Sequence, residues 1–218
     1  MSFSRRQEVL RSLKPHFPDF PVFFGFDYIP ELRSCIELKT PFIFCDHAYW
    51  DRGYSNANFR IVLSDIHQTG LVSRPLTRLP KLHPWKRGKH VLVFPPSDTI
   101  AKTFGAQSWA AETVETLKRH TDRPVIVKRK QDGDLDSFLQ DCHAVVGYAT
   151  VASTDAVIRG IPAFCGPHCP ATPIGLQDLS QIENPIYPDR AEWLRSLGSS
   201  QFNVSEFGSV REFLLGAR

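Results

Sequence analysis

Long hydrophobic runs are missing from this 218-residue sequence. A membrane-spanning helix needs roughly 20 consecutive apolar residues. The longest apolar runs here are much shorter, as at residues 91–94. Residues 1–6 lead into a polar stretch rather than into the apolar core of a signal peptide. We therefore expect no membrane span and a cytoplasmic location.

Cysteine is sparse and irregularly spaced. The five cysteines are an odd number without the spacing of a disulfide framework, so we expect reduced thiols. Cys165, His168 and Cys169 lie close together, but a structural zinc site takes four ligands. Asp65 and His67 add only a pair elsewhere in the chain. The sequence therefore predicts no metal site.

Several motifs that bind phosphates or activate nucleophiles are also absent. The chain has no P-loop, no Gly-x-Gly-x-x-Gly turn and no Gly-x-Ser-x-Gly elbow. These absences exclude the sequence patterns of P-loop NTPases, dinucleotide-dependent dehydrogenases and α/β-hydrolases.

Acidic residues are missing from residues 66–97, although the net charge of the chain is only +3. Basic side chains are frequent in this window, so residues 74–90 are named here the basic segment. Such a segment is suited to contact with the phosphates of DNA. It is equally typical of a solvated linker. Its basic residues are Arg74, Arg78, Lys81, Lys86, Arg87 and Lys89.

The rest of the composition is that of a globular protein. Hydrophobic residues make up 42% of the chain and charged residues 22%, which excludes a disordered, fibrous or coiled-coil protein. Pro75, Pro80 and Pro84 interrupt the pattern and indicate a connector. We therefore predict two lobes, residues 1–80 and residues 88–218.

The second lobe alternates between strand and helix patterns. Short apolar runs predict strands at residues 89–94, 125–127, 144–148 and 161–164, and helical spacing predicts helices at 108–120, 134–139 and 153–159. This alternation is typical of a parallel sheet covered on both faces.

The first lobe is less regular but still of the α/β type. Its pattern predicts helices at residues 4–13 and 29–36, and strands at residues 21–26, 42–45 and 58–64. The tail reads as helical at residues 190–197 and 204–215. The predicted fold class is α/β, with two Rossmann-like lobes and a parallel sheet in the C-terminal lobe.

Polar side chains follow three predicted strands of the second lobe. Ligands of open parallel sheets bind at the carboxyl ends of the strands, and a helix N-terminus there favours phosphate. Hydroxyls and cations at these strand ends suit a diphosphate, and a carboxylate suits a ribose diol. Each is also consistent with an ordinary helix cap or a solvated loop. The candidate donor-binding residues are Ser97, Lys128, Arg129, Thr150, Ser153 and Asp155.

Residues 145–162 resemble the donor-binding pattern of GT-B glycosyltransferases: an apolar strand, small hydroxyl residues, a carboxylate on a helix, a Gly-x-Pro turn and another strand. The resemblance covers roughly residues 91–164 and implies that Thr150 and Ser153 contact the donor diphosphate and Asp155 the ribose. The sequence departs from the family by having Asp155 where Glu is usual and Ala149 where Ser is common. Nucleotide-sugar epimerases share this half of the pattern.

The first lobe supplies a second group of candidates. Asp46 and His47 follow an apolar strand, and either side chain is suited to accept the proton of an acceptor hydroxyl. Adjacent residues on a strand point to opposite sides, and we favour Asp46. The alternative is that Asp46 caps a turn and His47 is structural. The candidate acceptor-binding residues after them are Tyr49, Trp50, Arg52 and Tyr54.

These features together favour a minimal GT-B-like glycosyltransferase that needs neither a metal nor another cofactor. In this hypothesis residues 1–80 form the acceptor lobe and residues 88–218 the lobe that binds a nucleotide-diphosphate sugar. Residues 46–50 and 188–194 resemble small uncharacterised phage and bacterial proteins, so hydroxymethylated DNA is one expected acceptor and a polysaccharide or lipid-linked sugar another. The alternatives are a non-catalytic nucleotide-sugar-binding protein and an epimerase-like enzyme.

Overall fold

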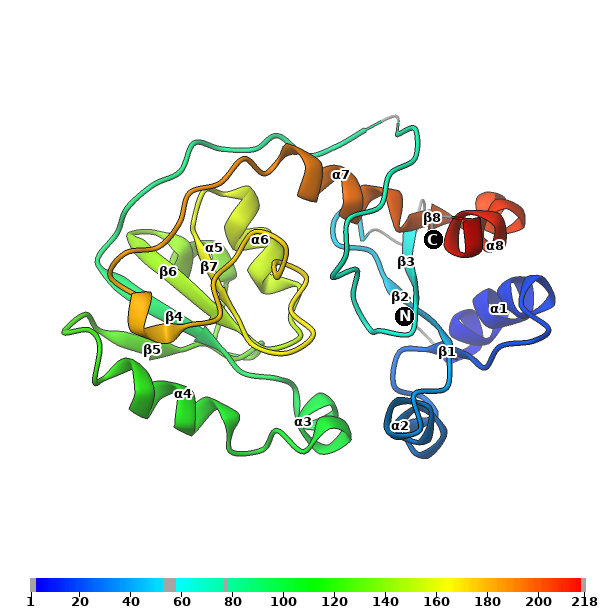
Figure 1. Ribbon diagram of the computed structural model, residues 1–218, viewed down its shortest axis with the longest axis horizontal. Coiled ribbons are helices and arrows are strands. Elements are labelled where there is room, and N and C mark those ends of the chain that lie inside the picture. Colours follow the sequence, from blue (N-terminus) through cyan, green and yellow to red (C-terminus); the bar gives the residue numbers. More distant parts are fainter. Residues whose placement is uncertain (1–2, 53–57, 77, 217–218) are drawn as a thin grey trace. The chain divides into compact units, whose positions relative to one another are not determined.

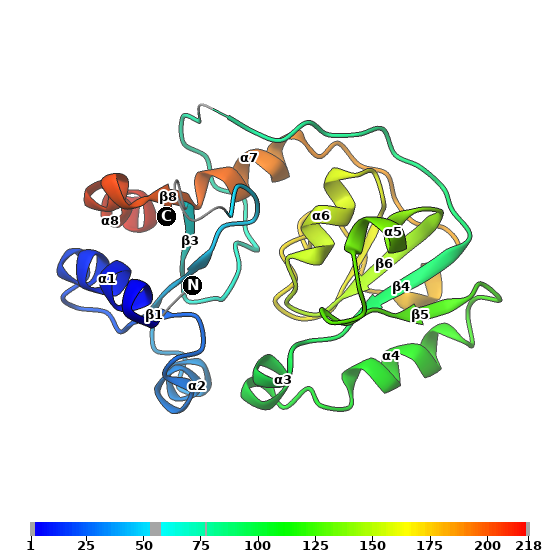
Figure 2. The same ribbon diagram turned by 180° about the vertical axis from the view of Figure 1, so that it is seen from behind.

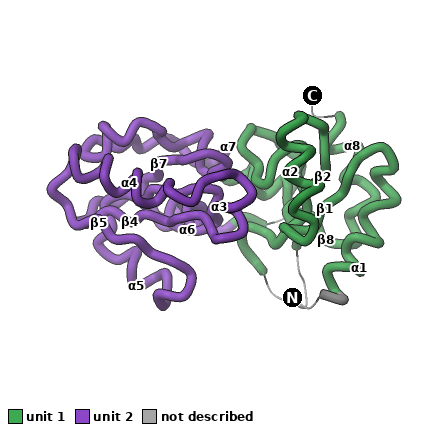
Figure 3. Tube along the Cα trace, turned by 90° about the horizontal axis from the view of Figure 1, so that it is seen from below, with its two compact units in different colours: residues 1–79, 194–218 green, residues 80–193 purple. Residues whose placement is uncertain are grey.

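The computed structural model describes residues 3–52, 58–76 and 78–216. The chain forms two compact units, coloured separately in Figure 3. Unit 1 consists of residues 1–79 and 194–218, and unit 2 of residues 80–193. The predicted C-terminal lobe included the whole tail, but residues 194–218 belong to unit 1.

Unit 1 is built on a four-stranded mixed sheet, named sheet A, with the order β1-β2-β3-β8. Its strands are β1 (Val22–Phe24), β2 (Ile43–His47), β3 (Asn58–Leu63) and β8 (Gln201–Asn203). β1 and β2 are parallel, whereas β3 is antiparallel to both β2 and β8. Sheet A is therefore not the all-parallel sheet of a Rossmann-like lobe.

The helices α1 (Phe3–Leu13) and α8 (Phe207–Gly216) pack on sheet A. Unit 1 also contains α2 (Ile29–Glu37) and most of α7 (Ala191–Ser199), whose first residues belong to unit 2. A short 3-10 turn follows α1 as η1 (Lys14–His16), and another precedes α8 as η3 (Val204–Glu206). The tail belongs to unit 1 because β8 pairs with β3 and α8 packs on that pair.

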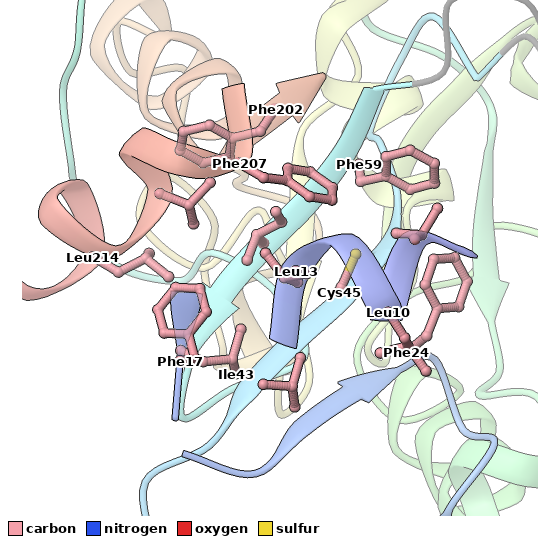
Figure 4. Close-up of a cluster of buried hydrophobic side chains, with 14 residues drawn as sticks. Leu10, Leu13, Phe17, Phe24, Ile43, Cys45, Phe59, Phe202, Phe207 and Leu214 are labelled. Atoms are coloured by element: carbon pink, nitrogen blue, oxygen red, sulfur yellow. The ribbon is translucent and has the colours of Figure 1, made fainter. Parts of the chain in front are cut away.

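Figure 4 shows the core of unit 1, where side chains from α1 and α8 meet one face of sheet A. Leu10 and Leu13 of α1 pack against Phe24, Phe59 and other apolar side chains of the sheet. Alternate residues of β2, Ile43 and Cys45, point into this core because side chains on a strand alternate between its faces. Burial of these apolar surfaces is the main stabilising contribution.

Unit 2 contains a second sheet, named sheet B, and all of its strands are parallel. The strands are β4 (His90–Phe94), β5 (Val125–Val127), β6 (Cys142–Gly147) and β7 (Ala163–Cys165). The helices are α3 (Asp98–Phe104), α4 (Trp109–Leu117), α5 (Leu135–Leu139) and α6 (Ala152–Ile158), and a 3-10 turn forms η2 (Leu179–Gln181). An α/β fold with a parallel sheet in this part of the chain is confirmed.

The strand order of sheet B is β5-β4-β6-β7. The chain therefore enters at β4, moves outward to β5 and then returns to the other side of β4 for β6 and β7. Figures 1 and 2 show α4 on one face of the sheet and α5 and α6 on the other. This arrangement creates a topological switch point between β4 and β6, where ligands of open α/β sheets bind.

Among the residues described, no helix combines the length and the apolar character that crossing a bilayer demands.

Candidate functional site

The first candidate site is the carboxyl edge of sheet B at the switch point between β4 and β6. Two loops leave the sheet there, residues 95–97 after β4 and residues 148–151 after β6. The amide of Tyr148 donates to the carbonyl of Phe94 at 3.3 Å, which ties the second loop to the end of β4. The predicted donor residues Ser97 and Thr150 therefore lie on neighbouring loops of one edge.

The backbone at this edge contains two unusual residues. Ala149 has a φ of 46° and His168, after β7, has a φ of 56°. A left-handed conformation is costly for residues other than glycine and is often found at functional sites. The Ala149 amide donates to the Pro167 carbonyl at 3.2 Å, so the two strained turns are joined.

The start of α6 packs closely on the end of β6. A Cβ atom added at Gly147 would lie 2.1 Å from Ser153 Oγ, so only glycine allows this approach. Ser153 itself is fully buried. The Ser153 hydroxyl therefore lies against Gly147, inside the protein rather than on its surface.

Thr150 and Asp155 remain partly exposed. The Thr150 hydroxyl accepts a hydrogen bond from the Ala152 amide at 3.2 Å in the turn before α6, whose N-cap is Val151. The Asp155 carboxylate lies 3.8 Å from the Arg159 guanidinium, which forms a shorter 2.6 Å ion pair with Asp136.

The other predicted donor residues have internal roles. Ser97 is the N-cap of α3 and accepts from the Ile100 amide. Lys128 is buried, and its ammonium donates to the carbonyls of Arg129 and Gly133 at 2.6 and 3.0 Å. The ammonium of Lys128 therefore binds carbonyls of its own loop. Arg129 has an exposed side chain.

Aromatic side chains gather beside the same edge, a feature that the sequence analysis missed. The ring centroids of Phe104 and His168 are 4.3 Å apart, and those of Trp109 and Tyr148 are 5.3 Å apart. Phe104 and Tyr148 are also in contact at 6.5 Å. Their separation along the chain gives no local pattern, so only the fold brings them together. Tyr148 is buried, whereas Phe104, Trp109 and His168 are partly exposed, and partly exposed rings can stack on a planar ligand.

The second candidate site lies at the end of β2 in unit 1. Asp46 and Arg60 are cross-strand partners in the β2–β3 pair, and Arg60 Nη2 donates to Asp46 Oδ2 at 2.7 Å. Asp46 Oδ1 accepts from the His47 amide at 2.7 Å. Arg60 is 5% exposed and also donates to the carbonyls of His47 and Ile66. Asp46 is thus held in an ion pair rather than in a turn cap.

His47 is half-buried and contacts the ring of Phe24 edge to face at 6.2 Å. Burial lowers the pKa of its imidazole, and the nearby Asp46 carboxylate only partly opposes that effect. The neutral form of His47 is therefore favoured, and this form has an unprotonated nitrogen that can accept a proton.

A second carboxylate near the ends of β1 and β2 escaped the sequence analysis. Asp27, which follows β1, accepts from Arg6 of α1 at 2.6 Å in an ion pair that is largely shielded on the aspartate side. Gly25, with a φ of 54°, allows the turn between β1 and Asp27. Asp27 could have been identified only through the parallel pairing of β1 with β2, because this pairing brings the ends of both strands to one edge of the sheet.

The predicted acceptor residues are mostly structural. Tyr49 is fully buried, and its hydroxyl accepts from the Gln68 amide at 2.8 Å, so its side chain has a structural role here. Trp50 is partly exposed and lies beside Gly198. Arg52 donates to the Ala48 and Tyr49 carbonyls. Tyr54 lies outside the described residues.

The basic segment is used partly within the protein. Arg74 donates to the Ser199 carbonyl at 2.9 Å and pairs with Glu206 at 2.9 Å. Lys86 donates to the Leu139 carbonyl, and Lys89 pairs with Asp141 at 3.2 Å. The remaining basic side chains are exposed; they are Arg78, Lys81 and Arg87.

All five cysteines are free and buried. The described residues contain no group of three or more His, Cys, Asp or Glu side chains arranged to hold a metal ion.

No known protein family matches the sequence. A search of curated proteins found no relative either.

Proposed function

We propose that the protein is a glycosyltransferase that takes its sugar from a nucleotide-diphosphate sugar, with the donor bound by unit 2. The observation that carries this proposal is the switch point between β4 and β6 at the carboxyl edge of sheet B. The resemblance of residues 145–162 to the GT-B donor-binding pattern falls on this same edge. The partly exposed polar residues Thr150 and Asp155 follow β6 there.

In this proposal, the Thr150 hydroxyl donates to a diphosphate oxygen while it accepts from the Ala152 amide. The Asp155 carboxylate accepts from a ribose hydroxyl. The partly exposed rings of Phe104 and Trp109, which both contact the buried Tyr148, offer faces for a nucleobase. These roles replace those predicted for Ser153 and Lys128, which the fold uses internally.

The proposed transfer forms a bond between the acceptor oxygen and the anomeric carbon and breaks the bond from that carbon to the donor phosphate oxygen. The nucleoside diphosphate leaves, and the proton of the acceptor hydroxyl moves to a base. We assign the base to His47 in place of Asp46, because Arg60 and the His47 amide already bind the Asp46 carboxylate. The lowered pKa of His47 keeps its imidazole neutral and able to accept a proton.

Hydroxymethylated DNA is the acceptor that we propose, and a polysaccharide is the alternative. The exposed members of the basic segment, Arg78, Lys81 and Arg87, are available to phosphates. Binding to such DNA should weaken steeply with salt. Affinity that stays constant between low and moderate salt would remove DNA as the acceptor.

A non-catalytic nucleotide-sugar-binding protein is a second candidate. Two observations favour it. Asp46, predicted as catalytic, is in an ion pair with Arg60, and Tyr49, predicted to bind the acceptor, is buried. Under this alternative, unit 2 binds the donor and no transfer follows.

The two candidates are separated by incubating the protein with a panel of nucleotide sugars, with and without hydroxymethylated DNA, and measuring released nucleoside diphosphate. Turnover that falls in His47→Gln supports the transferase. Binding without turnover supports the binding protein. Thr150→Val and Asp155→Asn should each weaken donor binding about tenfold, while Thr116→Val at a partly exposed position on α4 serves as the control. Absence of nucleotide binding would refute both candidates.

A further inference from the structure

The amino edge of sheet B, opposite the switch point, contains a cavity of about 270 Å³ that the proposed function does not use. It lies at the start of β4, β5 and β6. Its lining comes from the loops before β4 and β5 and from the first residues of β6. Residues of the segment 183–187, which follows η2, complete the lining. Its lining includes Arg87, Arg123, His143, Glu183 and Asn184.

His143 is the most unusual residue of this cavity. Its side chain is 3% exposed, and one ring nitrogen, Nε2, is 2.9 Å from the Ile182 carbonyl. A carbonyl only accepts hydrogen bonds, so Nε2 must bear the proton. The other nitrogen, Nδ1, is buried and has no hydrogen-bond partner among the described residues. A buried polar atom without a partner is costly, which indicates that something absent from the structure satisfies it.

The charges around the cavity favour an anion. Arg123 donates to both carboxylate oxygens of Glu183 at 3.0 Å and to the Gly88 carbonyl, so this pair is neutral overall. Burial opposes ionisation of Glu183, but hydrogen bonds from Thr121 and Arg123 outweigh it and lower its pKa, so the carboxylate stays charged. Arg87 forms no hydrogen bond or ion pair with the residues that the structure describes, and its positive charge is left uncompensated.

We propose that this cavity binds a phosphate ion between the Arg87 guanidinium and the His143 imidazole. A phosphate hydroxyl donates to Nδ1, which has no partner among the cavity residues that the structure describes, and the Arg87 guanidinium donates to the anionic phosphate oxygens. The charged groups that face His143 are Arg87, Arg123 and Glu183, of which the last two neutralise each other.

A neighbouring, more open depression of about 800 Å³ shares Arg123 and Glu183 with the cavity and is lined by Lys89, Lys118 and Arg119. This depression has room for the organic group of a phosphate ester. Free phosphate and the terminal phosphate of a nucleic acid therefore offer the same chemistry, and the experiment includes both.

The test uses the full chain with labelled histidine and inorganic phosphate as the probe, and follows the ring nitrogens of His143 by NMR. Phosphate should shift the Nδ1 resonance of His143, because Nδ1 then gains a hydrogen-bond partner, while the Nε2 resonance stays that of a protonated nitrogen bound to the Ile182 carbonyl. Arg87→Ala should weaken phosphate binding about tenfold. Lys130→Ala, an exposed basic residue of unit 2 that does not line the cavity, should leave it unchanged.

Phosphate that leaves His143 unchanged, or that binds equally well to Arg87→Ala, overturns the proposal. Because Arg87 is exposed, its removal is compatible with folding. A second arm compares one oligonucleotide with and without a 5′-phosphate. A change in the His143 signal that requires both the 5′-phosphate and Arg87 identifies the end of a nucleic acid as a source of the phosphate. Equal binding of both oligonucleotides without any change in the His143 signal counts against the site.

Discussion

The Arg60–Asp46 pair gives the sharpest prediction, because it decides whether Asp46 is structural. Arg60→Met keeps an apolar stem of similar length but removes the guanidinium. Three acceptors then lose their donor: Asp46 Oδ2 at 2.7 Å, the His47 carbonyl at 2.6 Å and the Ile66 carbonyl at 3.0 Å. Contacts of the guanidinium with the rings of Phe44 and Tyr49 are lost as well.

The magnitude follows from burial. A hydrogen bond to a charged group contributes about 1.5–3 kcal/mol, and a buried acceptor left without a donor costs a similar amount. The Asp46 side chain is 22% exposed, so water replaces part of what that carboxylate loses. We therefore expect Arg60→Met to lower the free energy of unfolding by about 3 kcal/mol. At a typical urea dependence of about 2 kcal/mol per molar, the unfolding midpoint of unit 1 falls by about 1.5 M.

Urea unfolding followed by fluorescence, together with hydrogen exchange of the β2 and β3 amides, measures this effect. The control is Arg33→Met on α2, whose side chain is 46% exposed and whose pair with Glu37 spans 3.9 Å; it should cost less than about 0.5 kcal/mol. A double-mutant cycle with Asp46→Asn should give a coupling energy above about 1 kcal/mol. Equal effects of the two arginine variants, or a coupling energy near zero, would refute the structural assignment of Asp46.

Three further predictions concern glycine packing and histidine. Gly147→Ala should destabilise unit 2 by about 1–3 kcal/mol because of the clash with Ser153 Oγ, and adding Ser153→Ala should recover part of that loss in urea unfolding. Gly160→Ala should cost more than Gly105→Ala: both have positive φ, but a Cβ at Gly160 would lie 2.0 Å from the Pro84 carbonyl, whereas nothing lies within 4 Å at Gly105; equal thermal shifts would contradict this. The lowered pKa of His47 means that the unfolded chain binds the proton more tightly, so stability should fall as pH drops below about 6.5; His47→Gln should show a weaker fall between about pH 7 and pH 5, and identical slopes would contradict it.

Much of unit 2 was predictable because its signals are local. The apolar run that became β4 ends at Pro95, and Gly160, with a φ of 83°, closes the turn after α6. Alternation of such segments predicts a parallel sheet and the edge at which its loops gather. Helix α3 was missed because its residues Asp98–Phe104 follow two prolines and lack a strong apolar face.

Unit 1 was less predictable because its sheet depends on distant pairings. The three residues of β8 carry no strand pattern of their own, and they become a strand only by pairing with β3. The same is true of side-chain roles. Lys128 and Arg129 are both basic residues after a strand, yet only the path of the loop decides that Lys128 turns inward to the Gly133 carbonyl while Arg129 stays exposed.

The parallel geometry of sheet B makes its two proposed sites separable. β4 has five residues at about 3.3 Å each, so the loops at its two ends are well over 10 Å apart. Thr150 and Asp155 lie at the carboxyl end of the sheet, and Arg87 and His143 lie at the amino end. Substitutions at such a distance without shared partners act independently. Loss of nucleotide binding in Thr150→Val with intact phosphate binding, and the reverse in Arg87→Ala, would therefore test each site without disturbing the other, and a failure at one end would leave the argument for the other unchanged.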